Sequence, residues 1–281
     1  MANTNAVHVE TFDEYKERFK EHMQMSRDEN GVIRVQLSTK GGEAVWSYQL
    51  HNAMCQLWKA IGNDKENSLM ILSGFDKEWI AQREVESFTE VEQHPDKNKR
   101  FDNGIIDTTK IIENFIMDIE IPTIGILNGP GFHWDAAVMC DITLAVPEFK
   151  FSDGHYVMGM GTVPGDGMTM LMQHFMGKKR ANYMSYTSEG ITAEEAKEYG
   201  LITEVVPREK IFERAEEIAA KIMAKDRIVR NMTHNIVARP LRRRIIEEMQ
   251  YHVTAEMYST SMMGYHHEFN DEAFLKEKGL A

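Results

Sequence analysis

Cysteine is scarce in this sequence: only Cys55 and Cys140 occur among its 281 residues. Both lie in apolar stretches with helical spacing, and neither belongs to a CxxC pair. A small domain held together by disulfides is therefore excluded, and so is a cysteine-based zinc finger.

Long apolar runs and an excess of positive charge are also missing. No apolar run approaches the ~18 residues of a membrane-spanning helix, and the first residues have neither the basic nor the apolar region of a secretory signal. The 32 basic residues are outnumbered by 44 acidic ones, which gives a formal net charge of -12. Such a chain repels nucleic acids and anionic membranes. We expect a soluble cytoplasmic protein with neither as a partner.

One basic cluster stands out against this acidic background, the segment RPLRRR at Arg239–Arg244. We interpret it as the solvated start of a helix, with phosphate binding as the second interpretation. The composition otherwise indicates a globular α/β domain, alone or with an extension, since 42% of the residues are apolar and 27% charged. The 20 methionines are expected mostly in the core, or else around a pocket for an irregular apolar ligand.

Predicted strands and helices alternate along the chain. Thr11 and Glu14 form a capping box for a helix over 11–25. Residues 76–100 are predicted to form a mobile loop with one short helix, which could act as a lid. Strands are predicted over 32–37, 68–74, 123–127, 142–146 and 201–207, and helices over 48–61, 105–120, 166–176, 191–200 and, broken near Pro240, from 208 to the C-terminus. Repeated strand–helix units predict parallel strands joined by right-handed crossovers.

The stretch from Ile121 to Gly167 concentrates the candidate chemistry. It predicts a strand, a tight turn at Asn128–Gly131, a short helix, a second strand and a glycine-rich loop before another helix. The N–H groups at a helix start lack intrahelical partners and suit a developing negative charge on oxygen. Around Trp134 this frame holds an unusual density of titratable groups, namely His133, Asp135, Asp153, His155 and Asp166.

The motifs of the chain, taken in order, resemble the crotonase (enoyl-CoA hydratase/isomerase) superfamily. They are IPTIGILNGPG, CDITLAVPEFKFSD, GTVPGDG, MGKKRANYM and ITAEEAKEYGLITEVVP, within a match from about Gly31 to Ala224. The resemblance implies an α/β spiral of ββα units over 31–207, a helical extension over 1–30, and a C-terminal helical region over 208–281 that assembles trimers or dimers of trimers. It also implies that the backbone N–H groups of Ala81 and Trp134 hold a substrate enolate oxygen.

The sequence departs from the CoA-dependent hydratases of that superfamily. His133, Trp134 and Asp135 stand where the hydratases carry glycines, and His155 stands where they carry a second glutamate. Alanines lie near the place of the first glutamate. The acid/base pair that adds water to an enoyl thioester is therefore missing, and the side chains at 133 and 134 are expected to crowd the N–H pocket.

These substitutions are similar to those of the branch that contains 6-oxocamphor hydrolase and its β-diketone hydrolase relatives. That branch cleaves the C–C bond between two ketones without CoA. It carries a tryptophan five residues before a histidine, a histidine after the NGP turn, a histidine–aspartate dyad across the glycine loop, and a glutamate preceded by histidine on the C-terminal helix. The matching residues are Trp46 with His51, His133, His155 with Asp166, and Glu268 after His267.

The resemblance implies a role for each matching residue. His155 would activate water while Asp166 orients its ring and stabilises the imidazolium, and His133 would hold or protonate the enolate. Trp46 and His51 would donate hydrogen bonds to the substrate, Glu268 would orient water or a histidine, and the pocket walls would come from Phe132, Trp134, Tyr156 and Met158, with Trp79 as a weaker candidate.

Each of these residues also has a purely structural interpretation. Asp166 could cap the following helix, His133 could pack at a helix start, and Trp46 could be a core tryptophan. His51 and Glu268 could be solvated surface residues.

Three other functions stay open. A CoA-dependent enzyme would need a phosphate and adenine site, and only Lys77 and Arg83 are basic near residue 81. A metal site made from the histidines and Asp166 lacks the H-x-x-x-H or H-x-H spacing that brings two ligands together. A catalytically silent scaffold would leave the five replacements unexplained. The prediction is therefore a β-diketone hydrolase that acts on a small apolar diketone and needs no cofactor or metal.

Overall fold

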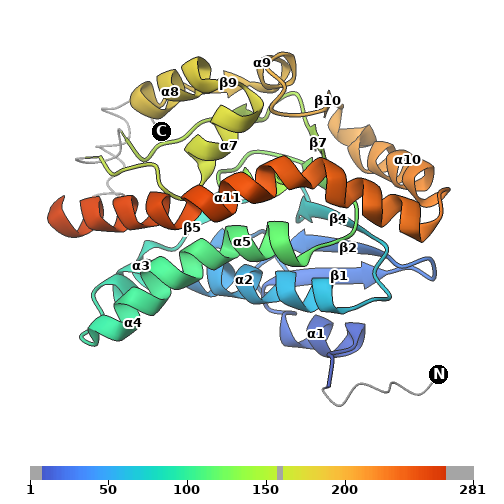
Figure 1. Cartoon of the computed structure of the whole chain (residues 1–281), viewed down its shortest axis with the longest axis horizontal. Coiled ribbons are helices and arrows are strands. Elements are labelled where there is room, and N and C mark those ends of the chain that lie inside the picture. Colours follow the sequence, from blue (N-terminus) through green and yellow to red (C-terminus); the bar gives the residue numbers. More distant parts are fainter. Residues whose placement is uncertain (1–7, 157–160, 264–281) are drawn as a thin grey trace.

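A six-stranded sheet forms the centre of the protein in the computed structural model, which describes residues 8–156 and 161–263 (Figure 1). The strand order is β1-β2-β4-β6-β7-β10, and all neighbours are parallel except β1 and β2. The strands are β1 (Met23–Arg27), β2 (Val32–Leu37), β4 (Leu69–Gly74), β6 (Thr123–Leu127), β7 (Ile142–Ala145) and β10 (Glu204–Val205). The predicted α/β class is confirmed.

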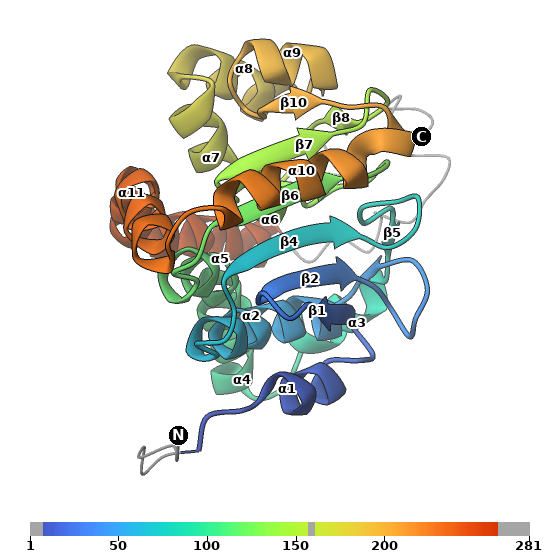
Figure 2. The ribbon, with the colours of Figure 1, turned by 90° about the vertical axis from the view of Figure 1, so that its right-hand side faces the viewer.

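Helices cover this sheet from both sides (Figure 2). On one side lie α2 (Tyr48–Asn63) and α5 (Thr108–Asp118), which pack together, and on the other α10 (Ile211–Met223) contacts β4, β6 and β7. Every residue of β4 and β6 is buried, as expected of parallel strands covered on both faces. The long helix α11 (Arg227–Met263) crosses the molecule against α5 (Figure 1). No helix in the described ranges is long and apolar enough to cross a bilayer.

Short strands and helices at the strand ends complete the fold. The order long strand, short strand, helix recurs as β2–β3–α2, β4–β5–α3 and β7–β8–α7, in line with the predicted ββα units. The short pairs are β3 (Val45–Trp46) with β5 (Gln82–Arg83), and β8 (Lys150–Phe151) with β9 (Ile191–Thr192). The remaining elements are α1 (Phe12–Arg18), α3 (Val85–Glu92), α4 (Lys97–Phe101), the π-helix η1 (Asp102–Asp107), α6 (Asp135–Val138), α7 (Met168–Phe175), α8 (Lys178–Thr187), α9 (Ala193–Glu198) and the 3-10 helix η2 (Arg208–Lys210).

The helix predicted over 11–25 forms only in the first part of that range. The capping box of Thr11 and Glu14 is present, but α1 ends at Arg18. Met23 and Met25 are buried while Gln24 between them is exposed, so this segment follows the period of a strand and pairs with β2 as β1. Two methionines two residues apart indicate a strand only weakly, and the well-capped helix before them favours a continued helix.

Two further predictions are corrected. Residues 76–100 hold β5, α3 and most of α4 rather than one short helix, because Asp96 caps α4 and Ser87 turns inward from α3. The C-terminal helix is not broken near Pro240, which lies inside α11. A proline within a helix removes one hydrogen bond, but buried Leu241 and Ile245 hold the following turns against the core. The divisions at residues 30 and 207 stay a prediction.

The side chain of Asn128 ties the turn after β6 to the loop after β4. Its Oδ1 accepts a hydrogen bond from the Gly74 N–H at 2.8 Å, and its Nδ2 donates to the carbonyls of Asp76 at 3.0 Å and Glu78 at 3.2 Å. A Cβ on the next residue, Gly129, would lie 1.6 Å from the carbonyl oxygen of Lys77. The NGPG turn therefore needs glycine at position 129, where a side chain would clash with the Lys77 carbonyl, and asparagine at position 128, whose amide binds the loop after β4.

We expect Asn128→Ala to lower the free energy of unfolding by about 2–4 kcal/mol, because it leaves several buried backbone groups without partners. Asn128 is only 1% exposed, so water has little access to replace its amide. Urea denaturation of both proteins measures the difference. Asn98→Ala, at an exposed position of α4, is the control and should stay within about 0.5 kcal/mol of the wild type. A similarly small loss of unfolding free energy for Asn128→Ala would contradict the stabilising role of the Asn128 amide.

Candidate active site

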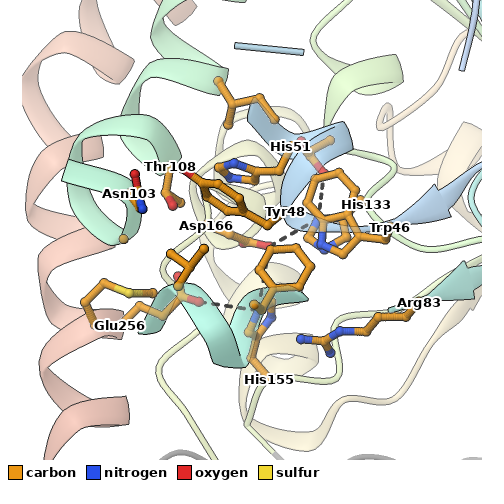
Figure 3. A pocket seen from close by; sticks show the side chains of 16 residues that line it. Trp46, Tyr48, His51, Arg83, Asn103, Thr108, His133, His155, Asp166 and Glu256 are labelled. Atoms are coloured by element: carbon orange, nitrogen blue, oxygen red, sulfur yellow. Dashed lines mark ion pairs between the residues drawn. The ribbon is translucent and has the colours of Figure 1, made fainter. Parts of the chain in front are cut away.

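A cavity of about 110 Å³ opens where the carboxyl ends of the parallel strands meet η1, α5 and α11 (Figure 3). This is the edge where α/β proteins commonly bind ligands. Five residues predicted from sequence line the cavity together although more than a hundred residues separate the first from the last: Trp46, His51, His133, His155 and Asp166. The fold therefore gathers the predicted residues into one site.

His155 is the best-anchored side chain of the cavity. Its Nδ1 lies 2.6 Å from Oδ1 of Asp153, and the same oxygen accepts a hydrogen bond from the His155 N–H at 3.0 Å. Asp153 is 3% exposed and lies two residues before the histidine, just after β8. With Nδ1 fixed in this way, Nε2 is the nitrogen left for chemistry in the cavity.

Two carboxylates face Nε2 of His155. Oδ2 of Asp166 and Oε1 of Glu256 each lie 3.7 Å away, and Figure 3 shows Glu256 approaching the histidine from α11. The predicted pairing of His155 with Asp166 therefore needs a correction, because the direct hydrogen bond goes to Asp153. Asp166 accepts a hydrogen bond through Oδ1 from the Met168 N–H at 3.1 Å, in a turn just before α7. The N-cap of α7 is Gly167, so the interpretation of Asp166 as the cap of that helix is off by one residue.

Burial and neighbouring charges shift the pKa values of His155, Asp153 and Asp166 in opposite directions. Burial alone would lower the pKa of His155, but the negative charges of Asp153 and Asp166 outweigh it and hold that pKa well above its ordinary value. Burial likewise raises the pKa of Asp153, yet the charge and hydrogen bonds of His155 bring it below the usual range. Asp166 has a raised pKa because it is buried. Asp153 and His155 thus form an ion pair, while burial pushes Asp166 toward its protonated form.

His133 lies on the opposite side of Asp166 from His155. Its Nδ1 is 3.9 Å from Oδ2 of Asp166 and 3.5 Å from Oδ1 of Asp135. The imidazole stacks on the ring of Trp46, with centroids 3.8 Å apart and planes inclined by 24°. Its backbone has φ of 51°, a left-handed conformation that is rare outside glycine and often found at functional positions. The His133 ring is thus held at the cavity wall by its stacking on Trp46 and by its backbone conformation.

His51 is a neutral member of the site. Burial, together with the charge of His133, lowers its pKa to about 3. Its ring lies edge-on to Trp46 with centroids 5.5 Å apart, and its Nδ1 has no hydrogen-bond partner within the described residues. The residue is 5% exposed, so its interpretation as a surface histidine is wrong. A neutral imidazole at this place can donate or accept one hydrogen bond.

Most of the residues predicted to form the pocket walls do not line the cavity. Trp134 is fully buried away from the cavity and donates its indole N–H to the Ser152 carbonyl, so it does not crowd the site. Trp79 is also buried and donates to the His133 carbonyl. Phe132 contacts the His133 ring but does not line the cavity, Ala81 is exposed, and Tyr156 lines a neighbouring cavity instead. Met158 and Glu268 lie outside the described residues.

The walls come from residues that the sequence did not single out. Phe88, Val91, Ile111 and Met257 supply apolar surface, and Asn103, Thr108 and Arg83 supply polar groups. The Tyr48 hydroxyl donates to Oδ2 of Asp107 at 2.9 Å, which ties α2 to η1 beside the cavity. Two further residues of the site carried a signal in the sequence without being assigned a role: Asp153, which was named among the titratable groups and stands two positions before His155, and Glu256, which follows His252 by one helical turn.

Arginine side chains and clustered acidic or histidine side chains are the groups that could hold a cofactor phosphate or a metal ion. Arg83 lines the cavity and its guanidinium lies 5.8 Å from the centre of the Phe88 ring. In the RPLRRR cluster, Arg242 donates to the Ile116 and Ile119 carbonyls and Arg244 to Gln173, so both help to dock α11. Within residues 8–156 and 161–263, no group of three or more histidine, cysteine or acidic side chains is arranged to hold a metal ion.

Comparison with known proteins gives a consistent family. The family described as enoyl-CoA hydratase/isomerase matches residues 27–275. The mitochondrial enoyl-CoA hydratase of Pongo abelii is 27% identical over 198 residues, 66% of this chain and 64% of that protein. The short-chain-enoyl-CoA hydratase of Clostridium acetobutylicum is 30% identical over 167 residues, 58% of this chain and 61% of that protein. The chain thus spans less than two thirds of the length of these curated relatives.

Solved structures add a different relative. A beta-diketone hydrolase from the cyanobacterium Anabaena sp. PCC 7120, bound to (S)-3-oxocyclohexyl acetic acid, is 29% identical with a TM-score of 0.82, and the match covers 89% of this chain and 98% of that one. An enoyl-CoA hydratase/isomerase from Mycobacterium paratuberculosis is 19% identical with a TM-score of 0.77, covering 92% of this chain and 98% of that one. The second similarity concerns the fold alone, which is the crotonase-like fold predicted from the sequence.

Proposed function

The chain belongs to the enoyl-CoA hydratase/isomerase family, and within it we propose a hydrolase that cleaves the C–C bond of a β-diketone without CoA. The observation that carries this proposal is the arrangement around His155. An imidazole held by a buried aspartate through Nδ1, with Nε2 facing the cavity, is the arrangement that activates water or a hydroxyl in hydrolase triads.

Water activation is the first step. The 3.7 Å separations from Nε2 to Asp166 and Glu256 are too long for direct hydrogen bonds and fit a water molecule shared among the three groups. Neutral His155 takes a proton from this water as the oxygen adds to one ketone. Asp153 stabilises the imidazolium that results. Glu256, on α11, would then take the role that was predicted for Glu268.

Bond cleavage and proton return complete the reaction. When the tetrahedral oxyanion collapses to a carboxylic acid, the C–C bond breaks and its electron pair stays on the neighbouring carbon as the enolate of the second ketone. The proton taken up by His155 balances the one that this carbon needs. Asp166 lies between His155 and His133 at 3.7 and 3.9 Å, which suits it to pass that proton to the histidine beside the enolate. Water is the only co-reactant.

Two further observations support a diketone rather than a thioester as substrate. The relative from Anabaena is a β-diketone hydrolase that binds a keto acid, and a keto acid is what this reaction makes from a cyclic diketone. The cavity also combines apolar walls at Phe88, Ile111 and Met257 with histidines at the reacting end, as an uncharged ring diketone requires.

A substrate panel tests the proposal directly. We expect the purified protein, without CoA, to consume cyclic β-diketones, followed by their loss of ultraviolet absorbance, with one equivalent of keto acid formed. Crotonyl-CoA assayed in parallel should stay unchanged. Turnover of the thioester alone would assign the protein to the CoA-dependent enzymes of the family, and turnover of no diketone would contradict the proposal.

A further inference from the structure

Arg83 is a charged residue of the cavity that takes no part in the reaction steps above. Among the described residues that line the cavity it is the only lysine or arginine, and the acids Asp135, Asp166 and Glu256 line the same space. A guanidinium stays positively charged at every physiological pH. Arg83 therefore suits a negatively charged group that the acids of the cavity would repel.

The pairing of two short strands directs Arg83 into the site. β3 and β5 run parallel with Trp46 paired to Arg83, and the Glu84 N–H donates to the Trp46 carbonyl at 2.8 Å. Paired residues point to the same face of a sheet, and both of these line the cavity. The guanidinium lies 5.8 Å from the centre of the Phe88 ring, which itself stacks on Trp46. In Figure 3 the Arg83 side chain extends from β5 toward His155.

The proposed reaction creates an anion in this cavity. The diketone and water are uncharged, but the acid formed at the attacked carbonyl gives its proton to the solvent at neutral pH, because carboxylic acids have pKa values of about 4. This carboxylate forms where His155 delivers the water, beside the carboxyl groups of Asp166 and Glu256 at 3.7 Å from Nε2. Another carboxylate at this place is unfavourable unless a cation faces it.

We propose that Arg83 forms a subsite for the carboxylate of the keto acid product. The inference rests on the proposed hydrolase function and names the residue that holds its product. A guanidinium carries several N–H donors in a planar fork, so it can bind a carboxylate through two parallel hydrogen bonds in addition to its contact with Phe88. The uncharged diketone gains much less from this group. Arg83 therefore favours the product over the substrate.

Arg83→Gln tests the subsite by binding. The probe is 6-methyl-5-oxoheptanoate, the keto acid that hydrolysis of 2,2-dimethylcyclohexane-1,3-dione yields, and its carboxamide is the uncharged comparison. Each is titrated while tryptophan fluorescence is followed, since Trp46 lines the cavity. The variant should bind the keto acid about tenfold more weakly, the lower end for a hydrogen bond to a charged group because Arg83 is exposed. Its affinity for the carboxamide should stay within about twofold of the wild type.

Two further variants sharpen the test. Arg83→Lys keeps the charge but loses the fork, so its affinity for the keto acid should lie between those of the wild type and Arg83→Gln. Arg239→Gln is the matched control, because Arg239 is an exposed arginine of α11 that does not line the cavity, and it should keep both affinities. An equal loss for keto acid and carboxamide in Arg83→Gln would make Arg83 a mere part of the wall. That result, or an unchanged affinity for the keto acid, would overturn the proposal.

Product inhibition separates this inference from the proposed function. During turnover of the dione, Arg83→Gln should raise the inhibition constant of the keto acid about tenfold, while the KM of the uncharged dione changes clearly less. If the dione is not hydrolysed, the hydrolase function fails, but the binding titration still decides the subsite. A loss of affinity confined to the keto acid would then uphold the carboxylate subsite, and any other result would overturn it as well.

Discussion

Replacing His155 by glutamine should lower kcat for β-diketone hydrolysis by about 10²- to 10⁴-fold, the usual contribution of a general acid–base residue. The backbone N–H of residue 155 still donates to Asp153, so the buried carboxylate keeps a partner, while the glutamine amide, placed near the position of Nε2, cannot take a proton from water. The KM should change much less, because the cavity walls are left in place. Steady-state kinetics on the best diketone of the panel measures both constants.

The matched control for this variant is His174→Gln. His174 is a half-buried histidine on α7 and does not line the cavity. Its replacement should leave kcat within about twofold of the wild type, which corresponds to the few tenths of a kcal/mol typical of positions away from a site. Thermal melting of both variants checks that they are folded. If His155→Gln kept wild-type turnover, water would have to be activated by another group, and the proposed mechanism would be wrong.

Local patterns predicted the strands of the sheet well because burial determines them. Strand β6 occupies Thr123–Leu127 and β2 occupies Val32–Leu37, as predicted, since β6 is a short apolar run between turn signals and β2 alternates apolar with polar residues. Strand β1 was missed because it follows a strong helix cap, and the break predicted at Pro240 did not occur because buried neighbours fix the helix on its C-terminal side. In both places tertiary packing outweighs a local preference.

The sequence predicted which residues form the site better than it predicted the contacts between them. His133 and His155 could be found because a titratable residue at a glycine turn or strand end is conspicuous in a sequence, whereas His51, inside α2, was found only through the resemblance to the β-diketone hydrolase branch. Which aspartate bonds to His155 could not be read from spacing, since Asp153 and Asp166 lie on either side of it in one long loop. Glu256 and the walls at Phe88 and Met257 come from helices whose rotation about their axes is set only by packing.

Asp153→Asn should have the second large effect on kcat, because Asp153 both orients His155 and stabilises its charged form. Loss of the corresponding carboxylate in serine-protease triads lowers kcat by about 10⁴. We expect Asp153→Asn to lose about 10²- to 10⁴-fold in kcat, since the amide can present its N–H₂ to Nδ1 and favour the wrong tautomer of the ring. Asp166→Asn should also lower kcat, because an amide cannot pass the proton to His133, but it should shift the pKa of His155 less than Asp153→Asn does, since Asp153 is the nearer acid at 2.6 Å against 3.7 Å.

The pH dependence distinguishes orientation by Asp153 from simple misfolding. The wild-type pKa of His155 is held well above its ordinary value, chiefly by the charge of Asp153 against the effect of burial. Since the neutral ring is the base, kcat/KM of the wild type should rise with pH and level off only above about pH 6.5, the ordinary pKa of histidine. Without the charge at 153, burial lowers the pKa of the ring, so the rising limb of Asp153→Asn should move to lower pH while its plateau falls. A limb that stays in place, or a larger limb shift in Asp166→Asn than in Asp153→Asn, would instead make Asp166 the partner of His155, as the sequence had predicted.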